Sequence, residues 1–167
     1  MDIDGSVVER RSRRYIPRGY RRFSLDRYTN LFFNARNAML YRRINDYNAE
    51  ERVVPESLVI VRVATSVLDL PGVVITEINA AAGIEPRWHT VEEGLGRLDH
   101  NEIFARYWED HGHMQRMMAE VLVPDRVPTR YLTGAYVVAE AVASNLPWSA
   151  RRPIAVSPYH FFKGEPV

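Results

Sequence analysis

One carboxylate, that of Glu120, stands where a polar segment of the sequence changes into a short apolar run. Residues 111–116 before it are compatible with a helix, and the run 121–123 after it is closed by Pro124 and Pro128. An apolar run of this length bounded by prolines predicts a strand. A carboxylate at the entrance of a strand lies either in a pocket or on the water-facing side of an edge strand, as most charged residues do. In a pocket it can hold a sugar hydroxyl and stabilise a cationic sugar carbon, as carboxylates do in glycoside transfer.

A second group with chemical potential is the arginine-rich segment near the N-terminus. Between residues 9 and 27 the arginines are interleaved with aromatic residues, and Glu9 and Asp26 are the acidic residues of the stretch. Arginine next to aromatic rings suits phosphate contacts combined with base stacking. It suits a solvated basic surface equally well, and this segment alone leaves both interpretations open. The arginines that we expect to contact phosphates are Arg10, Arg11, Arg13 and Arg14.

The sequence lacks the motifs of several common kinds of catalytic and binding site. The histidines are scattered without a metal-binding spacing, and the absence of cysteine removes disulfides and thiolate zinc sites. No G-x-S-x-G element, P-loop or G-x-G-x-x-G fingerprint is present. We therefore expect no metal site, no serine hydrolase, and no Rossmann-type or Walker-type nucleotide binding.

Length and composition predict a single domain over residues 1–167. Of these residues 46% are hydrophobic, which is enough for a sizeable core. The formal net charge is +1, so the overall charge gives no indication of a nucleic-acid partner. The sequence has no apolar signal region at its N-terminus and no stretch long enough to span a bilayer. We expect a soluble, cytoplasmic protein with no membrane partner.

The elements that must position the candidate residues have the pattern of an α+β fold. Strands outnumber helices without a regular βαβ alternation, so we expect a mixed, mostly antiparallel sheet with short helices. The strongest strand, 58–63, is nearly continuous and β-branched, and we expect it to be central and next to the strand that carries Glu120. Further strands are expected at 28–33, 73–76 and 154–156, and an extended segment at 159–162. Helices are expected at 6–14, 91–98, 101–108 and 135–145, and residues 34–41 are expected to form a turn that leads into a helix.

Five segments of the chain share their order and spacing with one known family. They are Glu9-Arg10-Arg11 followed by Pro17, residues 24–41, residues 73–79, Leu98-Asp99 with Ile103, and residues 116–123. Together they resemble the DarT-type, NAD-dependent ADP-ribosyltransferases, which modify single-stranded DNA and are toxins of a toxin–antitoxin system. The likeness covers most of the chain, and the combination is more specific than any one segment.

The resemblance implies an ADP-ribosyltransferase-like fold, NAD as the substrate that supplies ADP-ribose, and single-stranded DNA as the acceptor. It implies that Glu120 is catalytic and that it ends a substrate-recognition loop over residues 79–119. The family's catalytic arginine falls on Arg11, with Arg10 as the second choice. Because a guanidinium stays protonated at ordinary pH, orienting the reactants or stabilising charge is an easier role for it than acting as a base. A macrodomain-type hydrolase is implied as the antitoxin.

Further site residues are expected around the same chemistry. The two tyrosines among them fit a hydrophobic core as well as a pocket wall. The expected NAD-binding residues are Tyr28, Asn34, Arg36 and Tyr41, and the expected DNA-binding residues are Arg13, Arg14 and Asn79.

The sequence departs from the family ahead of the arginine element. Family members usually begin with a strand that bears a His-x-Thr element and grips NAD, whereas Met1 lies just upstream of Glu9 here. We therefore expect this chain to lack that segment. Two functions stay open: an active DNA ADP-ribosyltransferase, or a degenerate relative that binds single-stranded nucleic acid without turning over NAD.

Overall fold

The structure, a computed structural model, describes residue 9 and residues 24–45, 52–82, 87–147 and 152–165. The chain divides into two compact units, each assembled from two separate stretches. Unit 1 consists of Met1–Asn34 and Ser66–Val127, and unit 2 of Ala35–Thr65 and Pro128–Val167. We expected one domain over residues 1–167, and that expectation stays a prediction.

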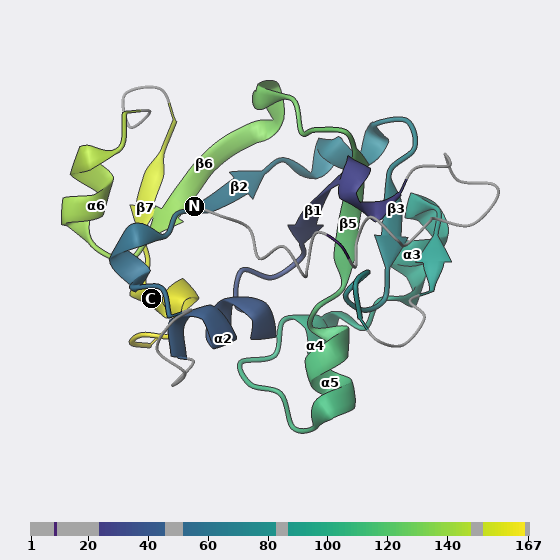
Figure 1. Cartoon of the computed structure of the whole chain (residues 1–167), viewed down its shortest axis with the longest axis horizontal. Helices are drawn as coiled ribbons and strands as arrows, with labels where there is room; N and C mark the ends of the chain where they lie inside the picture. Colours follow the sequence, from purple (N-terminus) through teal and green to yellow (C-terminus); the bar gives the residue numbers. More distant parts are fainter. Residues whose placement is uncertain (1–8, 10–23, 46–51, 83–86, 148–151, 166–167) are drawn as a thin grey trace. The chain divides into compact units, whose positions relative to one another are not determined.

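Unit 1 is built on a four-stranded antiparallel sheet with the order β1-β5-β3-β4 (Figure 1). Strand β5 lies between β1 and β3, so both of its edges are hydrogen-bonded. The strands are β1 (Tyr28–Phe32), β3 (Val74–Thr76), β4 (Trp88–His89) and β5 (Glu120–Pro124). The short helices are η1 (Leu25–Arg27), α3 (Val91–Arg97), α4 (His100–Ile103) and α5 (His111–Arg116), and η3 (Thr65–Asp69) begins at the boundary between the units.

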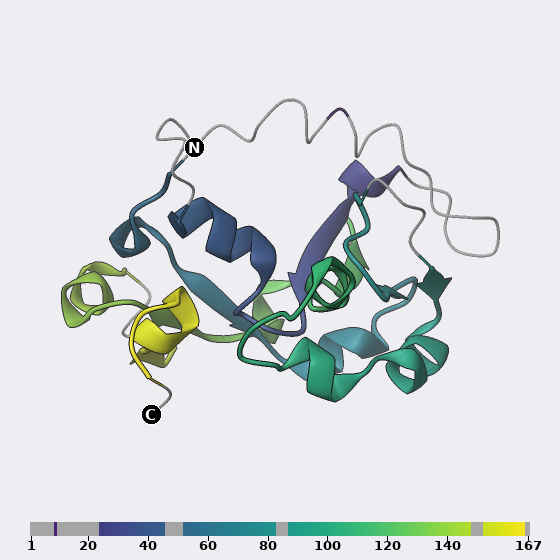
Figure 2. The ribbon, with the colours of Figure 1, turned by 90° about the horizontal axis from the view of Figure 1, so that it is seen from below.

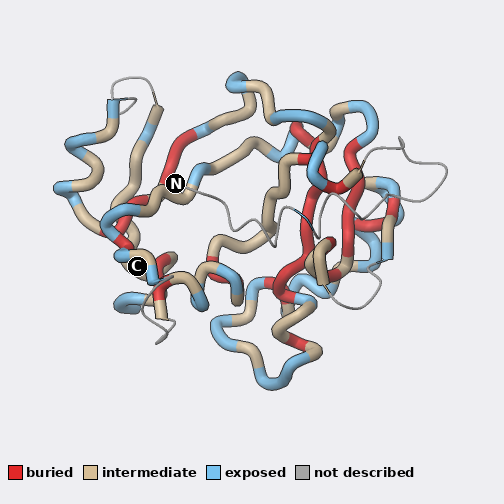
Figure 3. The backbone as a smooth tube through the Cα atoms, viewed as in Figure 1, coloured by how far each residue is buried: buried red, intermediate tan, exposed pale blue. Residues whose placement is uncertain are grey.

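An apolar cluster covers one face of this sheet around Leu122. In the antiparallel register Leu122 lies opposite Asn30 on β1 and Val74 on β3. Side chains alternate along a strand, so Glu120, two residues before Leu122, belongs to the same face. The buried core of unit 1 appears in red along β3 and β5 in Figure 3. The cluster consists of Leu25, Tyr28, Val74, Ala80 and Leu122, with Ala81 and Trp88 packed against it.

Helix α3 packs directly on strand β3 through Gly94. A Cβ atom at Gly94 would lie 2.6 Å from the Cβ atom of Ile75, which is closer than carbon atoms can approach without displacement. The helix begins with a capping box, in which Thr90 accepts from the Glu93 N–H and the Glu93 carboxylate accepts from the Thr90 N–H. The capping box begins α3 close to Gly94, whose lack of a side chain lets the helix approach strand β3.

Unit 2 contains a three-stranded sheet with the order β2-β6-β7, in which β6 is antiparallel to β2 and parallel to β7. Its core includes Ile44, Val138 and Phe161. In both views α2 (dark blue) lies next to η5 (yellow), as Figures 1 and 2 show. The elements are α2 (Ala38–Asn45), η2 (Pro55–Ser57), β2 (Ile60–Val63), η4 (Thr129–Tyr131), β6 (Leu132–Val137), α6 (Glu140–Asn145), β7 (Ile154–Val156) and η5 (Pro158–Phe161).

The expectation that residues 58–63 form the central strand beside that of Glu120 is wrong. Strand β2 begins at Ile60 and, within the part of the chain that the structure describes, pairs with β6 alone, in a different sheet from β5. Val61 in its middle is exposed. A run of β-branched residues favours an extended backbone, but its partners depend on long-range register, which a local pattern does not contain.

The helix expected over 135–145 is also wrong in its first part. Strand β6 continues to Val137, and α6 begins at Glu140. The strand is hydrogen-bonded to β2 on one side and to β7 on the other, and this pairing outweighs the helical spacing of the valines. Glycine at position 134 permits the close approach of the segment before β7, because a Cβ atom there would lie 2.4 Å from the carbonyl oxygen of Pro153.

Two other local expectations have different outcomes. Residues 159–162 are not extended, because the 3-10 turn η5 runs from Pro158 to Phe161 and places Phe161 in the core. Proline at the first position favours such a turn, since its φ angle is already set. The helix expected over 6–14 lies outside the described residues.

The predicted fold class is confirmed. Both sheets are small, four of the five strand pairings among the described residues are antiparallel, and the helices are short. Among the helices of residues that the structure describes, none combines the length and the apolar content needed to cross a lipid bilayer.

Candidate active site

Glu120 is the first residue of the inner strand β5 and is 0% exposed. Its Oε2 accepts hydrogen bonds from Asn30 Nδ2 at 2.7 Å and from the backbone N–H of Ala80 at 3.2 Å. Its Oε1 accepts from Asn79 Nδ2 at 2.9 Å. The position on an inner strand excludes the water-facing edge-strand alternative. A buried carboxylate is costly unless donors surround it, and this one has donors on both oxygens.

The turn after β3 brings two of these donors to Glu120. Thr76, which lies opposite Glu120 in the sheet, donates its hydroxyl to the carbonyl of Ile78 at 2.7 Å. The Oδ1 atom of Asn79 accepts from the Ala81 N–H at 2.8 Å, a local bond that asparagine makes readily in turns. Because Oδ1 faces that N–H, the Nδ2 group of Asn79 is directed at the carboxylate.

A hydrogen-bonding contact between Glu77 and His89 fixes the start of the same turn to strand β4. The Nε2 atom of His89 lies 2.8 Å from Oε1 of Glu77, and Nη1 of Arg87 lies 3.8 Å from the other oxygen of that carboxylate. His89 is buried at the end of β4, opposite Ile75. The contact links Glu77, at the start of the turn, to strand β4, and it thereby restrains the turn that carries Asn79.

The predicted site residues of unit 1 have different surroundings. Asn79, expected at the DNA, donates a hydrogen bond to Glu120, and its role at DNA stays a prediction. Tyr28, expected at NAD, is buried in the apolar cluster around Leu122. Asn34 donates from Nδ2 to the carbonyl oxygen of Ile103 at 2.9 Å, which ties the segment after β1 to the end of α4.

Two other predicted residues, Arg36 and Tyr41, belong to unit 2. Arg36 is buried, donates from Nη1 to the carbonyl oxygen of Tyr159 at 2.5 Å, and lies over the rings of Tyr159 and Phe162 at 4.2 and 4.4 Å. Tyr41 is 41% exposed and meets the ring of Phe162 edge-on at 5.0 Å. These contacts give both residues a packing function within unit 2, while their role at NAD stays a prediction.

The predicted catalytic and DNA-binding arginines lie outside the described residues. They are Arg10, Arg11, Arg13 and Arg14. Their roles stay predictions from the sequence.

The segment between α4 and α5 presents aromatic side chains to solvent. The helix expected over 101–108 ends at Ile103, and the residues after it are irregular until His111. Phe104 is 55% and Tyr107 is 63% exposed, and the guanidinium of Arg106 lies 5.3 Å from the Tyr107 ring centroid. Within the loop that the family resemblance assigns to substrate recognition, this segment has the side chains that stack on nucleobases.

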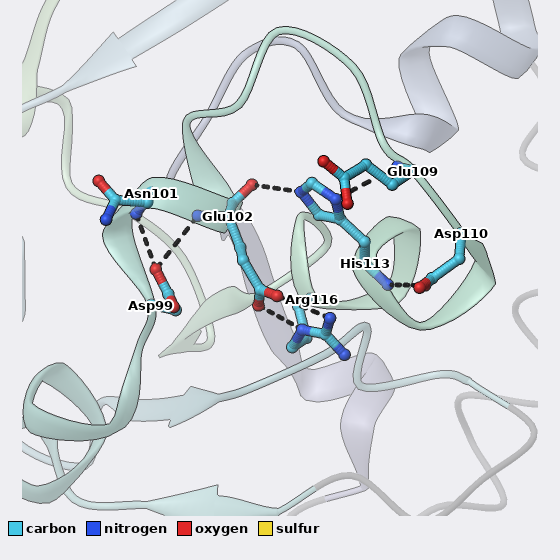
Figure 4. Close-up of polar contacts among 7 residues, drawn as sticks. All are labelled: Asp99, Asn101, Glu102, Glu109, Asp110, His113 and Arg116. Carbon is cyan, nitrogen blue, oxygen red and sulfur yellow. Dashed lines mark hydrogen bonds and ion pairs between the residues drawn. The ribbon is translucent and has the colours of Figure 1, made fainter.

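The imidazole of His113 closes the base of that segment (Figure 4). Its Nδ1 accepts from the backbone N–H of Glu109 at 3.2 Å, and its Nε2 lies 3.1 Å from the carbonyl oxygen of Glu102. A carbonyl only accepts, so Nε2 carries the hydrogen and Nδ1 does not. His113 therefore joins the two ends of the segment through both of its ring nitrogens, and this role had no signal in the histidine spacing.

Charged contacts reinforce the same two helices. Glu102 pairs with Arg116, whose pKa is raised above its ordinary value mainly by this hydrogen bond. Asp110 caps α5 by accepting from the His113 N–H at 2.7 Å, and this bond lowers the pKa of the Asp110 carboxyl. Asp99 caps α4 by accepting from the N–H groups of Asn101 and Glu102. Aspartates at both helix starts are the signals for these caps in the sequence.

Asn30 and Ala80 are the site residues that sequence reasoning missed. Asn30 is a polar residue on the strand face that also carries Tyr28 and Phe32, and this interruption of an apolar alternation was the available signal. Ala80 contributes only a backbone N–H, which no residue type reveals. No group of three or more His, Asp or Glu side chains in the described ranges is arranged to hold a metal ion.

Residues 2–162 match the family model described as ssDNA thymidine ADP-ribosyltransferase, DarT. The chain belongs to the DarT family, as the resemblance of its sequence segments indicated.

Individual relatives agree in fold. A DNA ADP-ribosyl transferase–DNA ADP-ribosyl glycohydrolase fusion protein of Thermosipho africanus is 31% identical over 163 residues, which is 95% of this chain and 40% of that protein. The structure of Thermosipho africanus DarTG in complex with ADP-ribose is similar with a TM-score of 0.77 at 30% identity, over 97% of this chain and 42% of that one. Thermus sp. 2.9 DarT in complex with NAD+ has a TM-score of 0.75 at 22% identity, over 90% of this chain and 80% of its own. This chain thus spans less than half of the Thermosipho protein.

Proposed function

We propose that this chain is an NAD-dependent ADP-ribosyltransferase that modifies a base of single-stranded DNA, with Glu120 as its catalytic carboxylate. The observation that carries the proposal is the burial of Glu120 at the start of β5, with hydrogen-bond donors on both of its oxygens, in a chain of the DarT family. Since the family is described as acting on thymidine, thymidine is the base that we propose.

The chemistry that this carboxylate suits is cleavage of the bond between nicotinamide and ribose. Nicotinamide leaves with the bonding electrons, and positive charge develops on the ribose. A fixed carboxylate in a site that excludes water stabilises this charge more strongly than bulk water does. The C1′ carbon of the ribose then bonds to the base, which loses a proton. ADP-ribose is thereby transferred without any change in oxidation state.

DNA contact is supported by side chains of unit 1 outside the carboxylate site. Phe104 and Tyr107 are exposed in the segment between α4 and α5, and Arg106 lies beside them. Aromatic rings with arginine form stacking surfaces for unpaired bases, and every base offers a ring face to them. The N-terminal arginines Arg13 and Arg14 supply phosphate contacts in this proposal.

A proposed toxin role is supported by the relative that carries a glycohydrolase part. The Thermosipho fusion protein joins a DNA ADP-ribosyl transferase to a DNA ADP-ribosyl glycohydrolase, and this chain matches 40% of its length. We propose that a macrodomain-type glycohydrolase counteracts this chain by removing ADP-ribose from DNA. Growth arrest by the expressed chain, relieved when such a hydrolase is co-expressed, is the expected result.

The enzyme proposal is tested by incubating the chain with NAD and a thymidine-containing single-stranded oligonucleotide. Release of nicotinamide and a mass gain of one ADP-ribose on the oligonucleotide are expected. The variant Glu120→Gln keeps the side-chain shape and should lose about 10²-fold or more in rate, as single charge-stabilising groups do elsewhere. Glu92→Gln, an exposed glutamate on α3, is the matched control and should keep its activity.

Two results would count against the proposal. If Glu120→Gln transfers ADP-ribose as fast as Glu92→Gln, Glu120 is not the catalytic group. If the parent chain binds the oligonucleotide and releases no nicotinamide, a binding module without NAD turnover replaces the enzyme assignment.

A further inference from the structure

Each oxygen of the Glu120 carboxylate has its own side-chain amide donor. Asn30 Nδ2 lies 2.7 Å from Oε2, and Asn79 Nδ2 lies 2.9 Å from Oε1. The last torsion of a glutamate is broad and roughly two-fold, so a carboxylate held through one oxygen keeps rotational freedom. Donors on both oxygens fix the plane of the carboxylate as well as its position.

We propose that Asn30 and Asn79 are positioning residues that set the orientation in which Glu120 meets the ribose. The inference rests on the proposed function of Glu120 and deepens it. It gives Asn79 a role at the carboxylate, while the role at DNA stays a prediction. It also assigns a function to Asn30, whose place in the sequence had indicated only a strand.

The strand register explains why Asn30 reaches Glu120. Phe32 lies directly opposite Glu120 on β1, and Asn30 lies opposite Leu122, two residues further along β5. Asn30 and Glu120 are therefore diagonal neighbours on one face of an antiparallel pair, within reach of a short polar side chain. A one-residue shift of register would move Asn30 to the other face, so the β1–β5 pairing is part of the site.

Asn79 reaches the carboxylate from the other side of β5. Its turn follows β3, and β3 pairs with β5 through Thr76 and Glu120. The side-chain oxygen of Asn79 is engaged by the Ala81 N–H at 2.8 Å, which leaves the amide nitrogen to face Glu120. The next residue, Ala80, adds its backbone N–H to Oε2. Strands on both sides of β5 thus contribute to holding one carboxylate.

These three donors share one electrostatic property, because none of them carries a charge. They stabilise the ionised carboxylate by hydrogen bonding without neutralising it as a lysine or arginine would at the same distance. Loss of one amide should accordingly disturb the chemical step more than the binding of NAD.

The test compares variants of Asn30 and Asn79 in steady-state turnover of NAD with the DNA oligonucleotide. Asn30→Leu removes the donor at similar volume and should lower kcat by about 10- to 100-fold with little change in KM, because a misplaced reacting group costs rate. Asn79→Leu should do the same. Asn30→Gln keeps an amide and should recover part of the loss. Thermal melts identify any variant that fails to fold.

The variant Asn30→Asp supplies a readout that a structural role would not move. It puts a second carboxylate beside Glu120, and two carboxylates at hydrogen-bonding distance share a proton until the pH is raised. The acid limb of the kcat profile should therefore move to higher pH. Asn145→Asp is the matched control, since it adds the same charge at an exposed position of α6 in unit 2, and its profile should match the parent.

A measurement without turnover separates this inference from the proposed function. In the 15N-labelled chain the side-chain amide signals of Asn30 and Asn79 should both shift on Glu120→Gln, while that of Asn145 should not. If every form is inactive and both signals shift, the enzyme proposal fails and the positioning stands. If the parent is active and the Asn30 and Asn79 variants match Asn145→Asp in rate and pH profile, the positioning is overturned. Unshifted amide signals in an inactive chain overturn it as well.

Discussion

Glu102 accepts hydrogen bonds from two nitrogens of Arg116, Nε and Nη2, and so links helix α4 to helix α5 (Figure 4). The Nη2–Oε1 distance is 2.7 Å. The pair lies at the base of the exposed segment that carries Phe104 and Tyr107, next to the bridge made by His113. It holds the ends of that segment together across a separation of 14 residues.

Replacing Arg116 with glutamine should loosen this segment more than it destabilises the protein. Exposed ion pairs contribute about 0–1 kcal/mol, so the melting temperature should fall only slightly. Chymotrypsin should cut after Tyr107 faster than in the parent, and moderate salt should speed cleavage of the parent in the same direction. Arg97→Gln, an exposed arginine on α3, is the control. Equal cleavage rates in the two variants would show that the pair does not restrain the segment.

Removing the exposed rings should weaken binding of single-stranded DNA. Stacking of one base on an aromatic side chain is worth about 1–3 kcal/mol, so Tyr107→Ala or Phe104→Ala should raise Kd about 5-fold or more. Leu95→Ala removes an exposed apolar side chain from α3 and should leave Kd unchanged. Fluorescence anisotropy with a labelled oligonucleotide measures this. Equal affinities for all three variants would remove the stacking surface from the proposed function.

The salt dependence of DNA binding should report on the N-terminal arginines. Each phosphate contact releases condensed counterions, so the logarithm of the affinity falls with the logarithm of salt concentration. The double variant Arg13→Ala, Arg14→Ala should reduce that slope by about 0.7 per lost contact on a single strand. The same titration on Arg42→Ala, Arg43→Ala from α2 serves as a control for net charge. An unchanged slope in the first variant contradicts the phosphate contacts.

Two glycines of helix α3 should respond oppositely to alanine. Gly94→Ala places a methyl group against Ile75 at 2.6 Å, and such overpacking costs about 1–3 kcal/mol. A methyl group at Gly96 would meet no atom of the described residues within 4 Å beyond its own helix turn, so Gly96→Ala should be neutral or should stabilise the helix by up to about 1 kcal/mol. Urea unfolding of both variants gives the two free energies of unfolding. Equal values would mean that α3 can move away from β3 without cost.

The stability of unit 2 should fall in mild acid because of His160. Burial, with Arg36 nearby, lowers the pKa of His160 below 6.5, and its ring stacks on Tyr136 at 4.0 Å. The folded state therefore disfavours the protonated ring. The unfolded chain binds the proton more readily, so stability is full above the ordinary histidine pKa and declines as pH falls below it. His160→Gln should flatten the melting temperature between pH 7.5 and pH 5. An unchanged slope would assign the acid sensitivity to other groups.

The sequence predicted the part of the candidate site at which a charged residue coincides with a change in the hydrophobic pattern. Glu120 stood at the boundary of a polar and an apolar run, and the family resemblance assigned its role. The donors around it depend on which strands are neighbours. Asn30 and Asn79 are 49 residues apart in the chain, and only the β1-β5-β3 order brings both to Glu120.

The fold was predictable at the level of class and of most strands. Strands β1, β3, β5 and β7 lie where local patterns placed them. The expected central strand at 58–63 failed because continuous β-branched residues were equated with burial on both faces, whereas β2 is half-exposed at the side of a small sheet. The expected helix at 135–145 failed because the pairing partners of β6 come from distant parts of the sequence.

The interleaving of the two units has a consequence for how such chains can diversify. The chain crosses between units after Asn34, after Thr65 and after Val127. A single recombination event between two related genes at the first crossing would take β1 and β5 from different parents. Recombination at the third crossing would take β2 and β6 from different parents. Recombination at the second crossing would separate β1 from β5 and β2 from β6. A whole unit can be exchanged between two genes only by recombination at all three crossings together. We therefore expect the two sheets to be inherited together.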